Sequence, residues 1–325
     1  MKNKNTISVT GGTGHLGINL IKILLDKEYL VKALIRHKSF PFLHPNLTWI
    51  QGDLNNLDSL NSLTDKSDAI IHCASAISLG ELDHNTIYEV NVKGTKNLLK
   101  ACLDKPIRFA YISSSTATQD PLYDEVFDEN RPHRSNKSFF YAWSKAQGEK
   151  HVLDYVKNKD IDGYILRPTA IVGPEDPGPS RFGRTILDLY NEKLPFITDG
   201  GYNMVDVRDL SLTIINSITK AEKGSVYLTG GQYISLRELA KLACPGKTPS
   251  VLPLDLLLKL LPFIKLYGKI FTLKWPINKE SLTTLKYAPK RMDCAKAINN
   301  LGHKNRATQT SVEDLIQWFT KNDIT

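Results

Sequence analysis

Two residues four positions apart carry side chains that together can move a proton to and from an oxygen atom. Tyr141 and Lys145 occur in the sequence YAWSK, within an expected helix over 139–157, so their side chains lie on one helix face. A free phenol has a pKa of about 10, and a neighbouring ammonium lowers that pKa by favouring the phenolate. The pair therefore predicts general acid–base chemistry, although a YxxxK match alone is common on helix surfaces.

A cluster of three serines, Ser113 to Ser115, makes a catalytic interpretation of the Tyr141–Lys145 pair stronger. The cluster ends 26 residues before Tyr141, at the end of an expected strand over 107–113. A serine hydroxyl in this position can hydrogen-bond a substrate carbonyl oxygen opposite the tyrosine. The combination predicts a site that stabilises charge on an oxygen while a proton moves.

Glycines three residues apart separate the first expected strand, 7–10, from the first expected helix, 15–27. In the sequence GGTGHLG, Gly11 permits a tight turn, Gly14 lets the backbone approach a pyrophosphate, and Gly17 lets helix and strand pack closely. The N–H groups at the start of the helix then hold the anion. Because the glycines stand between a strand and a helix, they predict a dinucleotide-binding loop.

The end of the second expected strand, 29–35, distinguishes NADP from NAD. An NAD site has a carboxylate there for the ribose 2′-hydroxyl, whereas this chain has Arg36, His37 and Lys38. A planar guanidinium pairs well with a 2′-phosphate. We therefore predict NADP(H), with Arg36 as the main contact and Lys38 assisting, and NAD(H) as the alternative. Asp53 is expected near the adenine.

Strand-like and helix-like segments alternate through the first half of the chain. This alternation predicts a Rossmann-type α/β fold with a doubly wound parallel sheet over 1–167. The smaller, mostly helical remainder, 168–325, is expected to bind substrate, with 203–220 packing back onto the sheet. A capping-box pattern from Thr310 to Glu313 predicts the start of the last helix. The expected strands are 7–10, 29–35, 47–51, 69–73, 107–113 and 163–167.

Composition excludes several classes of protein. The 325 residues are 41% hydrophobic and 23% charged, as in globular proteins. The net charge of +8 is spread along the chain without a basic run or an aromatic ladder, which argues against nucleic-acid binding. The four cysteines form no CxxC pair, so we predict no metal site and no disulfides, in a reducing cytoplasm. These cysteines are Cys73, Cys102, Cys244 and Cys294.

The most apolar segment is 251–273, which contains charged residues and two prolines. It is too interrupted to cross a bilayer as an apolar helix. We expect one or two helices that cover a pocket. Because lysines flank the leucines, a helix lying on a membrane surface is the alternative. The first residues lack the apolar stretch of a secretory signal.

Taken together, these motifs resemble the extended short-chain dehydrogenase/reductase family. Besides the glycine loop and the Ser–Tyr–Lys set, the matching sequences are HCA at 72–74, NVKGT at 91–95 and RPTAIVGP at 167–174. The segment GYNMVDVRDLS, at 201–211, is most similar to the branch of dihydroflavonol-4-reductase-like and 3β-hydroxysteroid-dehydrogenase-like proteins.

The resemblance implies a role for each site residue. Tyr141 would be the general acid–base, Lys145 would bind the nicotinamide ribose and lower the tyrosine pKa, and Ser115 would be the hydrogen-bond donor to the substrate oxygen. Counting back from Asp120, where relatives have glycine, selects Ser115 over Ser114. The expected cofactor contacts are Gly11, Thr13, Gly14, His15, Leu16, Gly17, Arg36, Lys38, Asp53, Leu54, Cys73, Ala74, Ser75, Asn91, Ser113, Tyr141, Lys145, Pro168, Thr169 and Ile171.

Departures from the family pattern narrow the reaction. Thr116 and Ala117 replace the Asp-Glu pair of sugar-nucleotide dehydratases, which disfavours dehydration. Asn203 and Met204 stand where many epimerases have an arginine for the diphosphate. We therefore predict an oxidoreductase that transfers hydride between NADP(H) and a carbonyl or secondary alcohol of a hydrophobic small molecule.

Three questions stay open. The first alternative function is a nucleotide-sugar epimerase or reductase that retains NAD(P). The second is an NADP-binding sensor without catalysis, which an intact Ser–Tyr–Lys set argues against. The resemblance also implies a homodimer formed through helices 88–103 and 139–157, although their apolar stripes are equally able to face the protein's own sheet.

Overall fold

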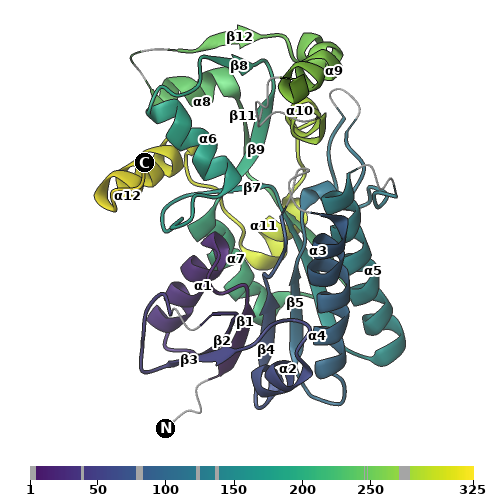
Figure 1. Cartoon of the computed structure of the whole chain (residues 1–325). Helices are drawn as coiled ribbons and strands as arrows, with labels where there is room; N and C mark the ends of the chain where they lie inside the picture. Colours follow the sequence, from purple (N-terminus) through teal and green to yellow (C-terminus); the bar gives the residue numbers. More distant parts are fainter. Residues whose placement is uncertain are drawn as a thin grey trace.

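The computed structural model describes residues 5–37, 40–77, 83–121, 125–135, 139–244, 246, 248–270 and 279–325, with side chains to residue 263 in the 248–270 range. The larger part of the molecule is built on a seven-stranded sheet with only parallel pairs, in the order β10-β6-β5-β4-β1-β2-β3. Figure 1 labels strands β1 to β5 of this sheet. Its strands are β1 (Thr6–Thr10), β2 (Leu30–Ile35), β3 (Leu47–Gln51), β4 (Ala69–His72), β5 (Arg108–Ile112), β6 (Asp162–Pro168) and β10 (Val226–Thr229).

The strand order reverses at β1, because the chain runs outward to β3 and then returns to place β4 on the other side of β1. Ligands of open α/β sheets bind at such a switch point, beyond the carboxyl ends of the strands. The predicted doubly wound Rossmann-type fold is confirmed. The sheet also takes β10 from the second half of the chain.

Helices cover both faces of this sheet, and each face has its own apolar cluster. On one face lie α1 (His15–Asp26), α7 (Val207–Lys220) and α11 (Ala295–Leu301). On the other lie α2 (Leu57–Thr64), α4 (Thr95–Ala101) and α5 (Phe140–Lys159). Apolar residues of α7 share a cluster with those of α1, which joins the two halves of the chain.

The helix expected over 88–103 is not one regular helix. It consists of α3 (His84–Tyr88), a π-helical turn η1 (Glu89–Gly94) and α4. Single π turns inside α-helices occur frequently at functional sites. Asn91 lies in this turn and is almost completely buried.

The rest of the chain forms a smaller, mostly helical part beyond the carboxyl end of β6 (Figure 1). Its strands are β7 (Ala170–Val172), β8 (Phe196–Thr198), β9 (Gly201–Asp206), β11 (Gln232–Ser235) and β12 (Ser250–Leu252). Its helices are α6 (Arg181–Tyr190), α8 (Leu236–Ala243), α9 (Leu254–Ile270), α10 (Lys279–Lys286) and α12 (Thr308–Lys321). The predicted mostly helical C-terminal region is confirmed.

Two details of this part concern the sequence predictions. Helix α12 begins at Thr308 after Ala307, so the capping box expected from Thr310 was wrong, and its residues lie inside the helix. The apolar segment 251–273 forms β12 and α9, and its last three residues lie outside the described ranges. Within the described chain, no helix combines the length and apolar character needed to cross a bilayer.

Candidate active site

The glycine loop has the geometry of an anion-binding turn. Gly11 has φ +72°, and a Cβ there would lie 2.7 Å from the Ala74 nitrogen. A Cβ on Gly17 would lie 2.1 Å from the Gly11 carbonyl oxygen, so both positions need glycine for packing. Gly14 is different, because a Cβ there would meet nothing closer than 3.5 Å. Gly14 is exposed and caps α1 without a side chain, which fits a backbone that approaches a phosphate.

The side chain of His15 holds the loop after β7. Its Nε2 lies 2.9 Å from the Gly173 carbonyl oxygen and 3.1 Å from that of Pro174. Asn19 donates to the same Pro174 oxygen at 3.0 Å. Thr13 is exposed in the loop and Leu16 is buried beneath it. His15 therefore fixes the glycine loop against a segment 158 residues further along the chain.

On the expected adenosine side, Arg36 is exposed immediately after β2. Asp53 is exposed after β3, and its Oδ1 accepts a hydrogen bond from the Asn55 N–H at 2.7 Å. Leu54 is buried next to it. Lys38 lies outside the described residues. The contact between Arg36 and a 2′-phosphate stays a prediction.

Asn91 ties together three elements around the expected nicotinamide end. Its Oδ1 accepts hydrogen bonds from the Ser75 hydroxyl at 3.1 Å and the Ala76 N–H at 2.7 Å. Its Nδ2 donates to the Ala76 carbonyl at 3.0 Å and the Ser144 hydroxyl at 2.9 Å. These four bonds use the whole amide, so the Asn91 side chain positions Ser75 and α5. The neighbouring Cys73 and Ala74 donate their N–H groups to the backbone and side-chain oxygens of Thr10.

Tyr141 lies in the first turn of α5, where burial raises the pKa of its phenol to about 12. Hydrogen bonding with the hydroxyls of Ser75 and Ser114 acts in the opposite direction and lowers that pKa. The groups that lower the pKa of Tyr141 in the structure are thus two hydroxyls, and the lowering by the Lys145 ammonium that the sequence suggested stays a prediction. At neutral pH the phenol carries its proton.

Lys145 lies one turn further along α5 and is 2% exposed. Its Nζ donates to the Ile112 carbonyl at 2.7 Å and stands 4.5 Å from the centre of the Tyr111 ring. Burial lowers the pKa of the ammonium to about 8, and the charge of Glu149 opposes this shift. The lysine is therefore held by neutral groups, with its nearest compensating carboxylate one turn away.

The three serines have different surroundings. Ser113 is buried, and its N–H donates to the Leu166 carbonyl at 2.8 Å. Ser114 interacts with the phenol of Tyr141, and its Oγ lies 2.9 Å from Oγ1 of Thr116. Ser115 begins the 3₁₀ turn η2 (Ser115–Ala117) and is buried. The structure thus brings Ser114 to the phenol, and the role of Ser115 stays a prediction.

Three of the expected cofactor contacts lie at the end of β6 and directly after it. Pro168 is buried at the end of β6, and Thr169 and Ile171 are partly exposed. A Cβ on Gly230 would lie 3.1 Å from Cγ2 of Thr169 and 2.0 Å from Sδ of Met292. The end of β6 therefore adjoins the C-terminal segment that contains Met292.

A model of the NAD dependent epimerase/dehydratase family matches residues 7–229, more than half of the chain. The chain belongs to this family.

Comparisons over most of the chain agree with this membership. A putative dihydroflavonol 4-reductase from Synechocystis sp. is 30% identical over 96% of this chain and 93% of its own length. The UDP-glucose 4-epimerase of Vibrio cholerae is 28% identical over 83% of each chain. The crystal structure of gox2253 has a TM-score of 0.86 at 26% identity, covering 99% of this chain and 100% of that one. The resemblance inferred from the motifs, and the prediction of a nicotinamide-dependent dehydrogenase or reductase, are confirmed.

This epimerase/dehydratase family member also contains a buried ion cluster that sequence reasoning missed. Glu149 accepts two hydrogen bonds from Arg167, at 2.9 Å and 2.7 Å, and its Oε2 lies 2.7 Å from Nε2 of His133. Burial alone would raise the pKa of the carboxyl group, yet the bonds from His133 and Arg167 hold it at about 2. The spacing could have indicated this cluster, because Tyr141, Lys145 and Glu149 are each four residues apart and therefore lie on one face of the helix.

Proposed function

We propose that the protein is an NADP(H)-dependent oxidoreductase that acts on a carbonyl or secondary alcohol of a hydrophobic small molecule, with Tyr141 as general acid–base. The observation that carries this proposal is the surroundings of the Tyr141 phenol. The residue is partly buried, the hydroxyls of Ser75 and Ser114 lower the pKa of its phenol, and it lies one helical turn from a lysine with a lowered pKa. A dinucleotide-type glycine loop follows the inner strand β1, at the carboxyl end of the same sheet.

In this proposal the Tyr141 hydroxyl donates its proton to the substrate oxygen during reduction and accepts it during oxidation. Its raised pKa supports the donor role, because the protonated phenol is the form present at neutral pH. Ser115 would donate a hydrogen bond to the same oxygen, and Lys145 would hold the nicotinamide ribose. When bound, the nicotinamide cofactor supplies the hydride in reduction and takes it in oxidation.

NADP(H) is proposed because the second strand ends in an exposed arginine. Arg36 forms no ion pair with any described residue. A guanidinium in this position is suited to a 2′-phosphate, whereas an NAD site has a carboxylate here.

A hydrophobic substrate is proposed from the C-terminal part. The relevant segments are 194–197 and α9, whose Leu254, Leu257 and Leu261 pack with Leu282 of α10. The Synechocystis relative is described as a reductase of a dihydroflavonol, which is an aromatic ketone. Aryl, terpenoid, sterol-like and long-chain ketones are therefore the classes to screen.

The first test compares the binding of NADPH and NADH by fluorescence titration and thermal shift. We expect tighter binding of NADPH, and a loss of about tenfold for NADPH alone in Arg36→Ala. Arg184→Ala, which removes an exposed arginine of α6, is the matched control. Equal binding of both cofactors, or a preference for NADH, contradicts the NADP assignment.

The second test addresses the chemistry. Tyr141→Phe should keep NADPH binding and lose about a hundredfold or more of the ketone-reductase kcat, because it removes only the proton donor. Full turnover by this variant would exclude Tyr141 as the acid–base.

A nucleotide-sugar epimerase is the second candidate, favoured by the similarity to the Vibrio cholerae enzyme. It predicts a nicotinamide cofactor, preferably NAD, that co-purifies tightly, and stabilisation by UDP- or GDP-sugars. Cofactor-free protein that does not respond to these sugars would exclude it.

A further inference from the structure

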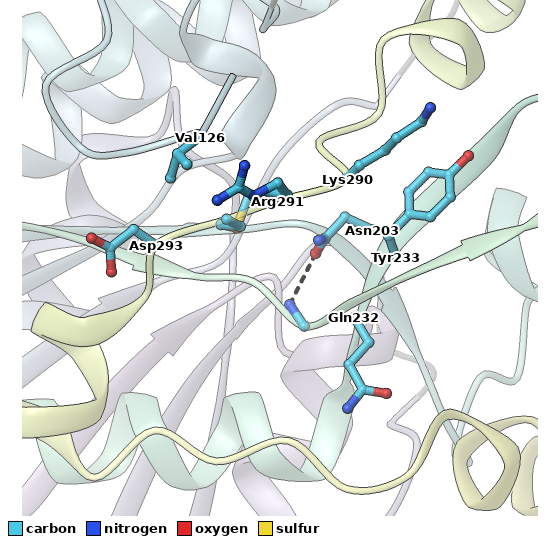
Figure 2. A pocket seen from close by; sticks show the side chains of 9 residues that line it. Val126, Asn203, Gln232, Tyr233, Lys290, Arg291 and Asp293 are labelled. Atoms are coloured by element: carbon cyan, nitrogen blue, oxygen red, sulfur yellow. Dashed lines mark hydrogen bonds between the residues drawn. The ribbon is translucent and has the colours of Figure 1, made fainter. Parts of the chain in front are cut away.

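A groove of about 670 Å³ opens where the C-terminal part meets the end of the main sheet. It lies between Val126, Asn203 of β9, the start of β11 and residues 290–293 (Figure 2). Its volume is in the range of sites for small molecules, about 300–1,000 Å³. None of the expected cofactor contacts lines it.

The groove adjoins the end of the proposed active site. Met292 lines the groove, and its Sδ would lie 2.0 Å from a Cβ on Gly230. The same Cβ would lie 3.1 Å from Thr169, one of the residues expected near the nicotinamide. Glycine at position 230 therefore lets the groove wall pack directly against the end of β6. A substrate held beside the nicotinamide is well placed to extend into the groove.

Two cations on the groove wall have no ionic partner within the described part of the chain. Lys290 and Arg291 are exposed, and neither forms an ion pair with a described residue. Figure 2 shows Arg291 in the middle of the wall, between Val126 and Asn203. By contrast, arginines packed within the fold are paired with carboxylates. These pairs are Arg131–Glu125, Arg134–Asp120, Arg167–Glu149, Arg208–Asp206 and Arg306–Asp209.

The backbone under Arg291 is held in place. The Phe127 N–H donates to the Arg291 carbonyl at 3.0 Å, and the Asp293 N–H donates to the Phe127 carbonyl at 2.9 Å. On the floor, the Asn203 Oδ1 accepts from the Gly231 N–H at 3.0 Å (Figure 2). A site whose backbone is already ordered loses less conformational entropy on binding.

A second groove, of about 420 Å³, shares Val126 with the first and has the opposite charge. Asp120, Glu125 and Asp128 line it, and its arginine, Arg131, is paired with Glu125 at 3.1 Å. The first groove has one carboxylate, Asp293, whose Oδ1 accepts from the Ala295 N–H. An anion is therefore directed to the Arg291 side of the 125–127 segment.

We propose that the groove of Arg291 binds an anionic group, a carboxylate or a phosphate, at the far end of a hydrophobic carbonyl substrate. Arg291 forms the charge-assisted hydrogen bonds and Lys290 adds charge. This inference rests on the proposed function and names its substrate class as amphipathic keto acids or phosphate esters of hydroxyketones.

The test measures binding without cofactor or turnover, so that its result is independent of the reductase assay. Octanoate, octyl phosphate and octanol are titrated into the full-length protein by isothermal titration calorimetry. We expect one or both anions to bind at least about tenfold more tightly than octanol, and Arg291→Gln to remove that advantage. Lys290→Gln should reduce it less, and Arg184→Gln on α6 should leave it unchanged.

Each outcome decides the proposal. Preference for octanoate supports a carboxylate site, and preference for octyl phosphate supports a phosphate site. Octanol binding as tightly as both anions, an unchanged preference in Arg291→Gln, or no detectable binding of either anion overturns it. Failure of NADPH binding with a retained anion preference would overturn the proposed function and leave the anion site standing.

Discussion

Two regions of α5, one helical turn apart, treat a buried charge in opposite ways. At the end that carries Tyr141, Lys145 is 2% exposed, and its Nζ donates a hydrogen bond to the Ile112 carbonyl and lies over the Tyr111 ring. At the rear, the Glu149 side chain is fully buried, but Arg167 and His133 surround its carboxylate. Burial lowers the pKa of Lys145 to about 8, whereas the partners of Glu149 outweigh burial and hold its pKa at about 2.

The difference separates a structural charge from an adjustable one. With a pKa of about 2, Glu149 keeps its charge at neutral pH, where its ion pair holds β6 and α5 together. Lys145 titrates close to neutral pH, so a small change in its surroundings alters its protonation. Shifted pKa values of this kind cluster at functional sites, and here the shift marks a lysine that forms no ion pair with any described residue.

The largest expected effect comes from breaking the rear cluster. Arg167→Met removes both bonds to Glu149 and leaves a buried carboxylate with only His133. Removing one partner of a buried ion pair costs about 3–5 kcal/mol. We expect a loss of that size in the free energy of unfolding, measured by urea denaturation at pH 7.

The double variant Arg167→Met/Glu149→Leu is the control for this loss. It replaces the whole pair with apolar side chains and should recover most of the stability, because no uncompensated charge is left. A double variant as unstable as Arg167→Met would show that the loss comes from packing, not from charge.

At Lys145 the expected change in the free energy of unfolding has the opposite sign. Lys145→Met removes an ammonium whose pKa is about 8 in the folded protein and 10.5 in the reference state. This difference corresponds to about 3 kcal/mol of destabilisation at pH 7. The variant should therefore be more stable than the wild type by up to that amount, less the cost of leaving the Ile112 carbonyl without its donor.

The pH dependence identifies the source of this gain. Between pH 8 and 10.5 the unfolded chain binds more protons at this lysine than the folded chain does, so wild-type stability rises with pH in this window. Lys145→Met should lack that rise. Urea denaturation at a series of pH values up to about 10 measures it, and equal slopes in both proteins would refute the unpaired-ammonium interpretation.

The sequence was sufficient for six of the seven strands of the main sheet and for the residues that form the glycine loop. All six expected strands are present. A short apolar run between two helical segments is typical of a strand in a parallel sheet that is covered on both faces, so this pattern was easy to recognise. The strand β10 was missed, since it comes from the second half of the chain, beyond the region in which strands and helices were seen to alternate. The capping box at Thr310 was wrong because the helix already begins at Thr308, so Thr310 lies inside its first turn.

Contacts between distant segments were beyond the sequence. The bond from His15 to Gly173 joins residues 158 apart, and Asn91 uses its whole amide inside a π turn that helical spacing does not predict. The hydroxyl that interacts with the Tyr141 phenol shows the same limit. Family spacing selects Ser115, whereas the fold of the strand end brings Ser114 to Tyr141.

Substitutions of Ser114 and Ser115 should therefore have different effects on the kinetics. Ser115→Ala should lower kcat by about a hundredfold by removing a hydrogen-bond donor to the substrate oxygen, without moving the pH profile. Ser114→Ala should have a smaller effect on kcat and should shift the alcohol-oxidation profile to higher pH, because its hydroxyl lowers the pKa of Tyr141. Steady-state kinetics across pH separates the two, and a shift in Ser115→Ala alone would exchange their roles.

The smallest expected effect lies at the edge of the rear cluster. His133 is partly exposed, and its Nε2 lies 2.7 Å from Glu149, while Arg167 already binds both carboxylate oxygens. His133→Ala should therefore cost about 1 kcal/mol of unfolding free energy, well below the loss in Arg167→Met. His133→Gln, whose amide can still donate to the carboxylate, should recover part of it. If His133→Ala lost as much unfolding free energy as Arg167→Met, the histidine would contribute as much as the arginine to holding Glu149. The contrast between Lys145 and Glu149 would then depend on both partners of Glu149 and not on the Arg167–Glu149 ion pair alone.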